Sequence, residues 1–174
     1  MKTKYPIHWP QFYTATIHEW KNLLTDNSCK DIIIDSLRFL VTDKRTELNA
    51  FVIMSNHVHI IWQALPGFTP GDIQASFMKF TAQQLKRKLA TANSALLETC
   101  KVNKYDREYQ IWKRDSLSID LFTSTVFDQK LEYIHYNPVK AGLCKFPEEY
   151  YYSSAGFYHS GVDEFGILTH CSGN

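Results

Sequence analysis

Two short apolar runs stand almost back to back in the middle of the chain, Leu48–Met54 and Val58–Trp62. Nearly continuous apolar runs of this length are typical of strands that are buried on both faces. Only the short turn region of Ser55 and Asn56 separates them, which favours an antiparallel hairpin. Because both runs are apolar on both faces, we expect the two strands to be central in their sheet.

Further helices and strands are expected on either side of this hairpin. The β-rich run Phe12–Ile17 predicts a first strand. Apolar residues at helical spacing between Ile32 and Val41 predict a first helix, with Ser28 as its N-cap. A second helix is expected after Pro70, with Phe77 and Phe80 on its apolar stripe.

The second half of the chain is less regular. Residues 90–107 are polar and are expected to form a loop, and Tyr109–Trp112 is expected to form a strand. A third helix is predicted over Thr123–Tyr136, ended by Pro138, because a proline disfavours helical geometry in the residue before it. From about residue 144 we expect an irregular C-terminal tail.

This order of elements indicates an α+β fold. Strand, helix, strand, strand, helix, strand and helix follow one another, which is typical of a ferredoxin-like two-layer sandwich with a central antiparallel sheet. A length of 174 residues favours one domain over 1–174. A hydrophobic content of 44% and a charged content of 21% are enough for a packed core.

Bulk charge and cysteine content restrict the function classes. The formal net charge is only +1, so any surface that binds phosphate must come from local clustering of basic residues. The four cysteines are scattered without a CxxC pair, which argues against a zinc knuckle or ribbon. No apolar run approaches the ~20 residues that span a bilayer. We therefore expect a cytoplasmic protein with reduced thiols and no membrane partner.

A pair of histidines interrupts the second apolar run. His57 and His59 are separated by one valine, and because side chains alternate along a strand the two imidazoles point to the same face. Two imidazoles on one face can share a metal ion. A chance His-x-His is the ordinary alternative, but imidazoles in a central strand need partners, which favours a functional pair.

A second group of polar residues lies on the third predicted helix. Tyr133 and Asn137 are four residues apart, so their side chains are neighbours on one helix face. An amide oxygen can act as a third metal ligand beside the histidines, and the phenol would then face whatever the metal polarises. Imidazole and amide donors without an acidic cluster suit Mg²⁺ or Mn²⁺ better than a zinc hydrolase site.

Two sequence blocks carry a family resemblance. Residues 54–60 (MSNHVHI) and 133–143 (YIHYNPVKAGL) together resemble the IS200-like transposases, and more closely their REP-associated tyrosine transposase branch. The resemblance extends over about residues 12–158. It implies the HUH (histidine, hydrophobic, histidine) nuclease fold with a single catalytic tyrosine.

The resemblance also implies roles for individual residues. His57 and His59 match the metal-binding pair, Asn137 matches a polar third ligand, and Tyr133 matches the nucleophile. The implied activity is metal-dependent cleavage and rejoining of single-stranded DNA through a 5′-phosphotyrosine intermediate, with imperfect hairpins as the recognised DNA. Relatives act as monomers or homodimers, and both states stay open here.

Binding of single-stranded DNA requires positive charge and stacking surfaces. The basic residues of the second helix are candidates, and Lys79 lies in a segment that is similar to a DNA-facing helix of the family. Lys140 lies inside the second family block. The predicted DNA-binding residues are Lys79, Lys86, Arg87 and Lys140.

One departure from the family keeps an alternative function open. Relatives commonly carry an acidic residue followed by histidine after the position of Arg114, whereas this chain has Ser118 and Ile119 near that place. A non-catalytic DNA-binding protein that retains the transposase fold is therefore the alternative hypothesis. The enzyme is favoured by the joint presence of four residues that binding alone does not need: His57, His59, Tyr133 and Asn137.

Overall fold

A computed structural model describes residues 8–170 of the chain. Its core is a four-stranded sheet in the order β2-β3-β1-β6, in which every pair of neighbours is antiparallel. The strands are β1 (Gln11–Thr16), β2 (Thr46–Ile53), β3 (His57–Ala64) and β6 (Leu117–Asp120). Taking β6 as the fourth strand of the core, this is the strand order of a ferredoxin-like β-α-β-β-α-β unit, as predicted.

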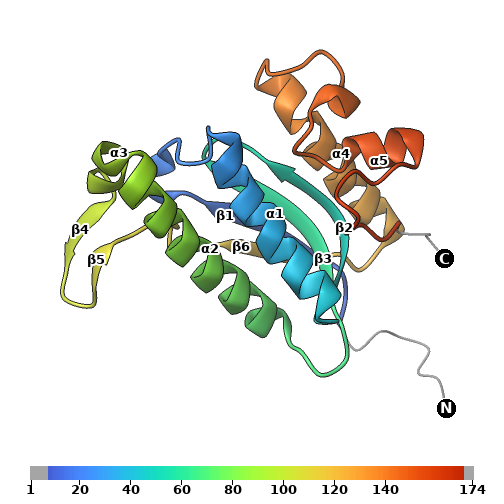
Figure 1. The fold of residues 1–174 in the computed structure, drawn as a ribbon. Helices are drawn as coiled ribbons and strands as arrows, with labels where there is room; N and C mark the ends of the chain where they lie inside the picture. Colours follow the sequence, from blue (N-terminus) through green and yellow to red (C-terminus); the bar gives the residue numbers. More distant parts are fainter. Residues whose placement is uncertain (1–7, 171–174) are drawn as a thin grey trace.

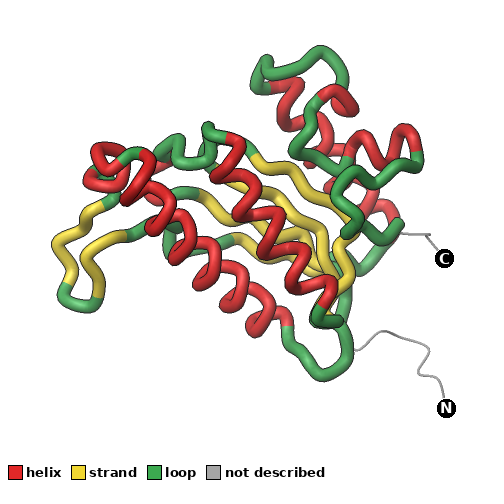
Figure 2. The backbone as a smooth tube through the Cα atoms, in the orientation of Figure 1, coloured by secondary structure: helices red, strands yellow, loops and turns green. Residues whose placement is uncertain are grey.

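Two helices cover one face of the sheet (Figures 1 and 2). They are α1 (Asn27–Thr42) and α2 (Pro70–Ala92), and they occupy the two helix positions of the ferredoxin-like unit. Buried residues at helical spacing, such as Leu37 on α1 and Phe77 on α2, pack against Tyr13 and Trp62 of the sheet in one large core. The N-cap of α1 is Asp26, whose carboxylate accepts the Ser28 N–H, so the prediction of Ser28 as the cap was wrong by two residues.

The other face of the sheet is covered by the helix α4 (Ser124–Lys140). Phe127 and Ile134 of this helix form a second, smaller core with Phe12, Val52 and Ile61 of the sheet. The helix begins after Thr123, whose hydroxyl accepts the Val126 N–H. α4 is therefore an addition to the two-layer unit on the side opposite to α1 and α2.

The helix α4 does not end at its proline. Pro138 lies inside the helix, which continues to Lys140, so the predicted end of the helix was wrong. A proline removes one N–H, but its own carbonyl remains a good acceptor, and here the Leu143 N–H donates to it over 3.0 Å. One further turn thus carries Lys140 close to the face that holds Tyr133.

The segment between α2 and β6 differs from the prediction. The expected loop over 90–107 contains α3 (Ser94–Glu98), β4 (Lys101–Lys104) and the start of β5 (Arg107–Tyr109), and β4 and β5 form a separate hairpin. The expected strand Tyr109–Trp112 does not join the main sheet beyond a single bridge from Ile17 to Trp112. The indole N–H of Trp112 instead points inward and donates to the Thr81 hydroxyl over 2.9 Å.

The C-terminal part of the described chain protects the edge of the sheet. β2 is an edge strand rather than a central one, which corrects the prediction for this strand. Its outer edge is paired by later residues: Ile53 N–H donates to the Tyr152 carbonyl and Ser154 N–H donates to the Phe51 carbonyl, both over 2.9 Å. Both faces of β2 are apolar for a separate reason, because one packs into the large core below α1 and the other into the small core below α4. The segment contains the short helices η2 (Pro147–Glu149) and α5 (Ala155–Ser160), and it is otherwise irregular.

Candidate active site

The two histidines lie at the start of β3, on the sheet face that α4 covers. His57 and His59 alternate with Val58, which belongs to the core on the opposite face. The two imidazole rings are 4.8 Å apart between centroids. Phe12 of the neighbouring strand stacks on His59 at 5.4 Å and forms the floor of the site.

Each histidine has one nitrogen that is held by an oxygen atom of the protein. The Nδ1 atom of His57 is 2.7 Å from the Asn56 Oδ1 atom, and the Nδ1 atom of His59 is 2.7 Å from the Thr14 hydroxyl. The Nε2 atom of His59 is buried and has no hydrogen-bond partner among the described residues. When Nδ1 donates to such a partner, Nε2 carries the lone pair that a metal ion requires.

Burial keeps both imidazoles neutral. Burial lowers the pKa of His59 to about 3, with smaller contributions from the neighbouring His57 and Lys130. Burial also lowers the pKa of His57, and a hydrogen bond with the Asn137 side chain partly opposes this effect. At neutral pH both rings are therefore available as neutral ligands.

Tyr133 and Asn137 approach the histidines from α4. The Tyr133 ring lies 5.2 Å from His59 and 5.9 Å from Phe12 between centroids, and 41% of the residue is exposed. Asn137, one helical turn later, interacts with His57. The structure thus brings the four predicted residues of the centre together from two elements that are far apart in the sequence.

The donor set fits a metal that prefers oxygen and imidazole ligands. His57 and His59 would hold it, with the Asn137 amide oxygen as a third ligand. Within residues 8–170 no cluster of three or more His, Cys, Asp or Glu side chains could hold a metal ion. An orphaned, buried His59 Nε2 beside a second neutral imidazole is costly unless a ligand completes it.

Two lysines place positive charge beside the tyrosine. The Nζ atom of Lys140 lies 5.5 Å from the centre of the Tyr133 ring. The Nζ atom of Lys130 lies 5.8 Å from the same ring and 4.8 Å from the ring of Phe12. Lys140 was predicted from the sequence and Lys130 was missed, although its spacing of three residues from Tyr133 places it on the same helix face.

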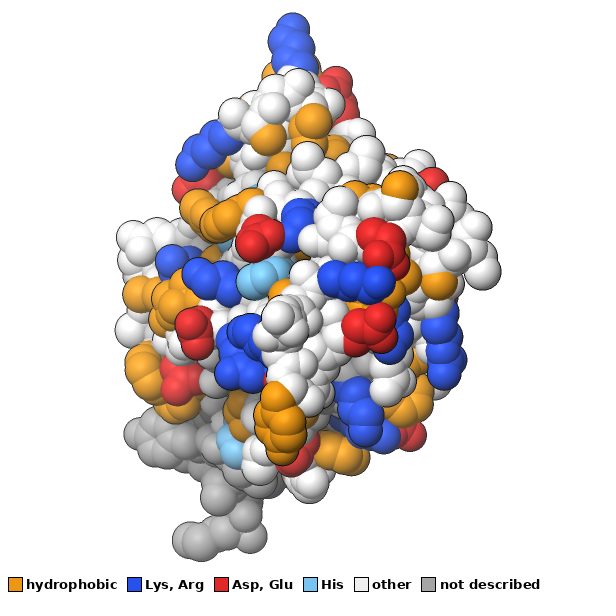
Figure 3. Space-filling model, turned by 90° about the vertical axis from the view of Figure 1, so that its left-hand side faces the viewer, with side chains coloured by type: hydrophobic (Ala, Val, Ile, Leu, Met, Phe, Trp, Pro, Cys, Tyr) orange, Lys and Arg blue, Asp and Glu red, His pale blue; other side chains and the backbone are white. Residues whose placement is uncertain are grey.

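The other predicted DNA-binding residues lie elsewhere. Lys79, Lys86 and Arg87 are exposed on α2, which packs on the sheet face opposite to α4. They are therefore not part of the group around Tyr133. In the view of Figure 3, lysine and arginine side chains are interspersed with acidic ones rather than gathered in one patch.

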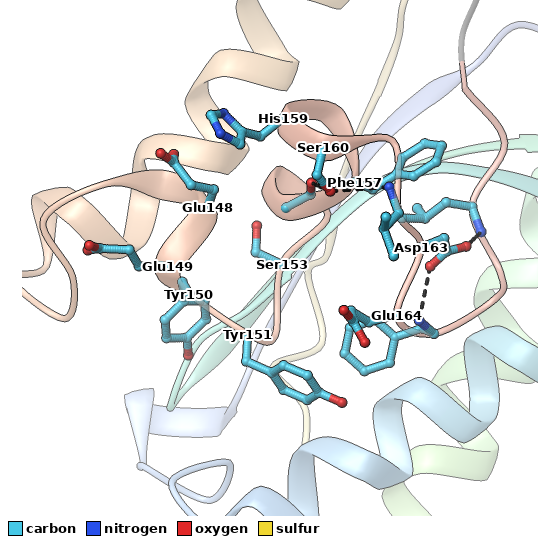
Figure 4. Close-up of a pocket in the computed structure, with 14 residues that line it drawn as sticks. Glu148, Glu149, Tyr150, Tyr151, Ser153, Phe157, His159, Ser160, Asp163 and Glu164 are labelled. Carbon is cyan, nitrogen blue, oxygen red and sulfur yellow. Dashed lines mark hydrogen bonds between the residues drawn. The ribbon is translucent and has the colours of Figure 1, made fainter.

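A pocket of about 440 Å³ lies in the C-terminal segment, away from this centre (Figure 4). Its lining includes the acidic Glu148, Glu149 and Glu164 and the aromatic Tyr151 and Phe157. None of the four residues of the histidine and tyrosine centre lines it.

Comparison with known proteins defines the class. The family model "Transposase IS200 like" matches residues 13–135, which is more than half of the chain. The chain belongs to the IS200-like transposase family. The matched region includes His57, His59 and Tyr133.

Solved structures show the same fold. One, "Structure of the REP associates tyrosine transposase bound to a REP hairpin", is 19% identical, with a TM-score of 0.64, and the match covers 100% of this chain and 96% of that chain. A protein from Deinococcus radiodurans R1, described as a transposase, is 17% identical, with a TM-score of 0.51, and the match covers 77% of this chain and 94% of that chain. A search of curated proteins finds no match. Among the helices of residues 8–170, none is long and apolar enough to cross a membrane.

Proposed function

We propose that this transposase cuts and rejoins single-stranded DNA with Tyr133 as its nucleophile. The observation that carries the proposal is the 5.2 Å separation between the rings of Tyr133 and His59. A partly exposed phenol next to two neutral imidazoles, with lysines on either side, is suited to attack a phosphodiester. A phenol packed there for stability alone would need neither the lysines nor the unpartnered His59 nitrogen.

In the first step the Tyr133 oxygen attacks the scissile phosphorus. The new bond joins the tyrosine to the 5′-phosphate, the bond from phosphorus to the 3′ oxygen breaks, and the phenol proton is transferred overall to that oxygen. The products are a 5′-phosphotyrosine and a free 3′-hydroxyl. Because the linkage conserves the phosphodiester bond, a 3′-hydroxyl can reverse the step and rejoin the strand.

A divalent cation, Mg²⁺ or Mn²⁺, held by His57, His59 and Asn137, would supply Lewis acidity to the phosphate. The contact of Asn56 with His57 and that of Thr14 with His59 would fix the orientation of the two rings. Lys130 and Lys140 would bind the phosphate oxygens and offset their negative charge. Phe12 keeps His59 in place from below.

Imperfect hairpins are the proposed substrates, which would place the chain in the REP-associated branch. Two observations support this: the block 133–143 resembles that branch, and the fold is matched over its whole length by a protein bound to a REP hairpin. Lys79, Lys86 and Arg87 could then contact only a part of the DNA that reaches the α2 side. We propose them as contacts to the hairpin stem rather than to the cleaved strand.

One feature favours the alternative of binding without cleavage. Ile119 pairs with Phe12 and packs into the small core beside it, near the position where relatives carry an acidic residue and a histidine. An apolar side chain at this place can neither bind a metal ion nor transfer a proton. Under this alternative, the protein binds DNA through the same surface but does not cleave it.

A cleavage assay separates the two functions. Labelled hairpin oligonucleotides from the DNA that flanks the gene are incubated with the protein and Mn²⁺ or Mg²⁺, or with a chelator. The proposal predicts cleavage that requires metal and is lost in a variant with both His57→Ala and His59→Ala, while the hairpin is still bound. Binding without cleavage by the wild-type protein under every metal would leave the alternative.

A further inference from the structure

An exposed tryptophan lies beside the histidine centre. Trp20 is 59% exposed, and its ring is 5.9 Å from that of His57 at an angle of 71°. The rings of Trp20, His57, His59 and Tyr133 follow one another, each within 6 Å of the next. Trp20 therefore stands at the end of the site that is opposite to the nucleophile.

The backbone at Trp20 is held in an unusual conformation. Glu19 and Trp20 have φ values of 56° and 57°, in the left-handed region that residues other than glycine rarely adopt. Such a conformation is unfavourable and persists only where its surroundings enforce it. The turn is closed by the Trp20 N–H, which donates to the Ile17 carbonyl over 2.9 Å, and by an ion pair of Glu19 with Lys21. Two strained residues thus present an indole to solvent beside the site.

The turn is tied to a candidate metal ligand through one side chain. Asn56 donates from Nδ2 to the Trp20 carbonyl over 3.4 Å, while its Oδ1 atom accepts from His57 Nδ1 at 2.7 Å. A second link joins the two loops, because the Ile17 N–H donates to the Asn56 carbonyl over 2.8 Å. The backbone from which the indole projects is therefore fixed relative to His57.

We propose that Trp20 stacks on an unpaired nucleobase next to the scissile phosphate, an inference that rests on the proposed function. If the scissile phosphate lies between Tyr133 and the histidines, the next nucleotide lies close to His57 and therefore within reach of the Trp20 indole. An unpaired base offers a flat face to an exposed aromatic ring, and this contact is a general device for holding single strands. Trp20 is then a DNA-binding residue that fixes where the strand enters the site.

The test combines protein and DNA changes. Trp20→Ala and Trp20→Phe are compared with the wild-type protein and with Phe39→Ala, which removes another exposed aromatic residue from α1. The probes are single-stranded oligonucleotides that carry one abasic site at each position on either side of the cleaved bond. Equilibrium binding by fluorescence anisotropy and single-turnover cleavage are both measured.

At one position the abasic site should weaken binding by wild-type protein on the order of tenfold to a hundredfold. Trp20→Ala should bind intact DNA more weakly than the wild type by the same factor. Its affinity for the probe with that abasic site should be no lower than its affinity for intact DNA. Trp20→Phe should retain most of the affinity, and Phe39→Ala should behave like the wild type. The affinity of Trp20→Ala for Mn²⁺ should stay within about twofold of the wild type.

Three outcomes would overturn the stacking role: losses that multiply at every position, wild-type affinity of Trp20→Ala, or a collapse of its Mn²⁺ affinity, which would mean a structural role. Failure of the proposed function gives a different result. If the wild-type protein never cleaves but the losses still coincide at one position, stacking stands without the chemistry. If cleavage is intact and the losses multiply everywhere, the chemistry stands without stacking.

Discussion

At the scale of single residues, the Thr14 hydroxyl determines which nitrogen of His59 faces the site. It lies 2.7 Å from Nδ1, and when it accepts the proton of that nitrogen, Nε2 keeps the lone pair that a metal ion requires. Thr14→Val preserves the shape but removes this partner, and losses of such partners typically cost tenfold to a hundredfold in metal affinity. We expect the Kd for Mn²⁺, measured by calorimetry, to rise by about that factor.

Thr16→Val is the matched control for this change. Thr16 lies two residues further along β1, and its hydroxyl makes no hydrogen bond within the described part of the chain. Its affinity for Mn²⁺ should therefore stay close to that of the wild type. Equal losses in both variants would show that the hydroxyl of Thr14 does not orient His59.

The main residues of the site could be predicted from the sequence because each follows a short-range rule. Alternation along a strand places His57 and His59 on one face, and helical spacing places Asn137 beside Tyr133. The partners Thr14 and Trp20 could not be found this way. The position of Thr14 depends on the register of β1 against β3, which pairs it with His59, and no local pattern specifies that register. The position of Trp20 depends on a left-handed turn after β1, which residues other than glycine rarely form.

At the scale of elements, Ser154 connects three parts of the fold. Its buried hydroxyl accepts the Phe51 N–H of β2 over 3.0 Å and lies 2.9 Å from His135 Nε2 of α4. Ser154→Ala leaves both groups without this partner. An unsatisfied buried polar group costs about 1–3 kcal/mol, so urea unfolding should show a loss of about 2 kcal/mol.

Ser124→Ala is the control for this loss of stability. Ser124 is exposed at the first residue of α4 and makes no side-chain hydrogen bond within residues 8–170. It should change stability by less than about 0.5 kcal/mol. If Ser154→Ala is equally mild, the C-terminal segment contributes little to the stability of β2 and α4.

Alkaline pH should weaken the contact that Tyr150 makes between the C-terminal segment and β2. Its hydroxyl donates to the Ile53 carbonyl over 2.8 Å, and burial, followed by the nearby Cys144, raises its pKa to about 12. In the unfolded chain the pKa of a tyrosine is ~10. The stabilisation is thus complete below pH ~10 and is lost as pH rises toward ~12.

A melting series compares the wild type with Tyr150→Phe between pH 8 and 12. The difference in Tm between the two proteins should be constant up to pH ~10 and shrink above it, because ionisation removes the hydrogen bond that Phe also lacks. A difference that stays constant through pH 12 would contradict the raised pKa. Other buried tyrosines affect both proteins alike, so they cancel in the comparison.

The elements themselves were predictable to different degrees. The hairpin of β2 and β3 was predictable from two continuous apolar runs, and the helices α1, α2 and α4 from apolar residues at helical spacing. The edge position of β2 was not predictable, because an edge strand with helices packed on both faces is as apolar as a central one. The continuation of α4 through Pro138 was missed because a proline disfavours a helix without forbidding it.

At the scale of the whole molecule, two sets of basic residues lie on opposite faces of the sheet. Lys130 and Lys140 flank Tyr133, while Lys79, Lys86 and Arg87 lie on α2. Each contact to a phosphate of single-stranded DNA adds about 0.7 to the salt dependence of binding. A variant with both Lys130→Gln and Lys140→Gln should therefore show a slope of log binding constant against log salt concentration that is smaller by about 1.4. This reduction is expected for both a short unstructured oligonucleotide and a hairpin.

The α2 residues should behave differently. A variant with Lys79→Gln, Lys86→Gln and Arg87→Gln should weaken the binding of the hairpin and leave the unstructured oligonucleotide unaffected. This pattern is expected because only a stem can reach the α2 side while the cleaved strand lies at Tyr133. If the triple variant binds the hairpin as the wild type does, these residues form an ordinary solvated helix face.

The central claim is that Tyr133 forms a covalent bond to DNA, and mass spectrometry of the trapped adduct tests it most directly. Trypsin cuts after Lys130 and Lys140, so residues 131–140 carry both Tyr133 and Tyr136, and fragmentation of this peptide distinguishes the two. We predict a nucleotide on Tyr133 in the wild type and in Tyr136→Phe, and none in Tyr133→Phe. A nucleotide on Tyr136, or cleavage in Mn²⁺ without any adduct, would contradict the account.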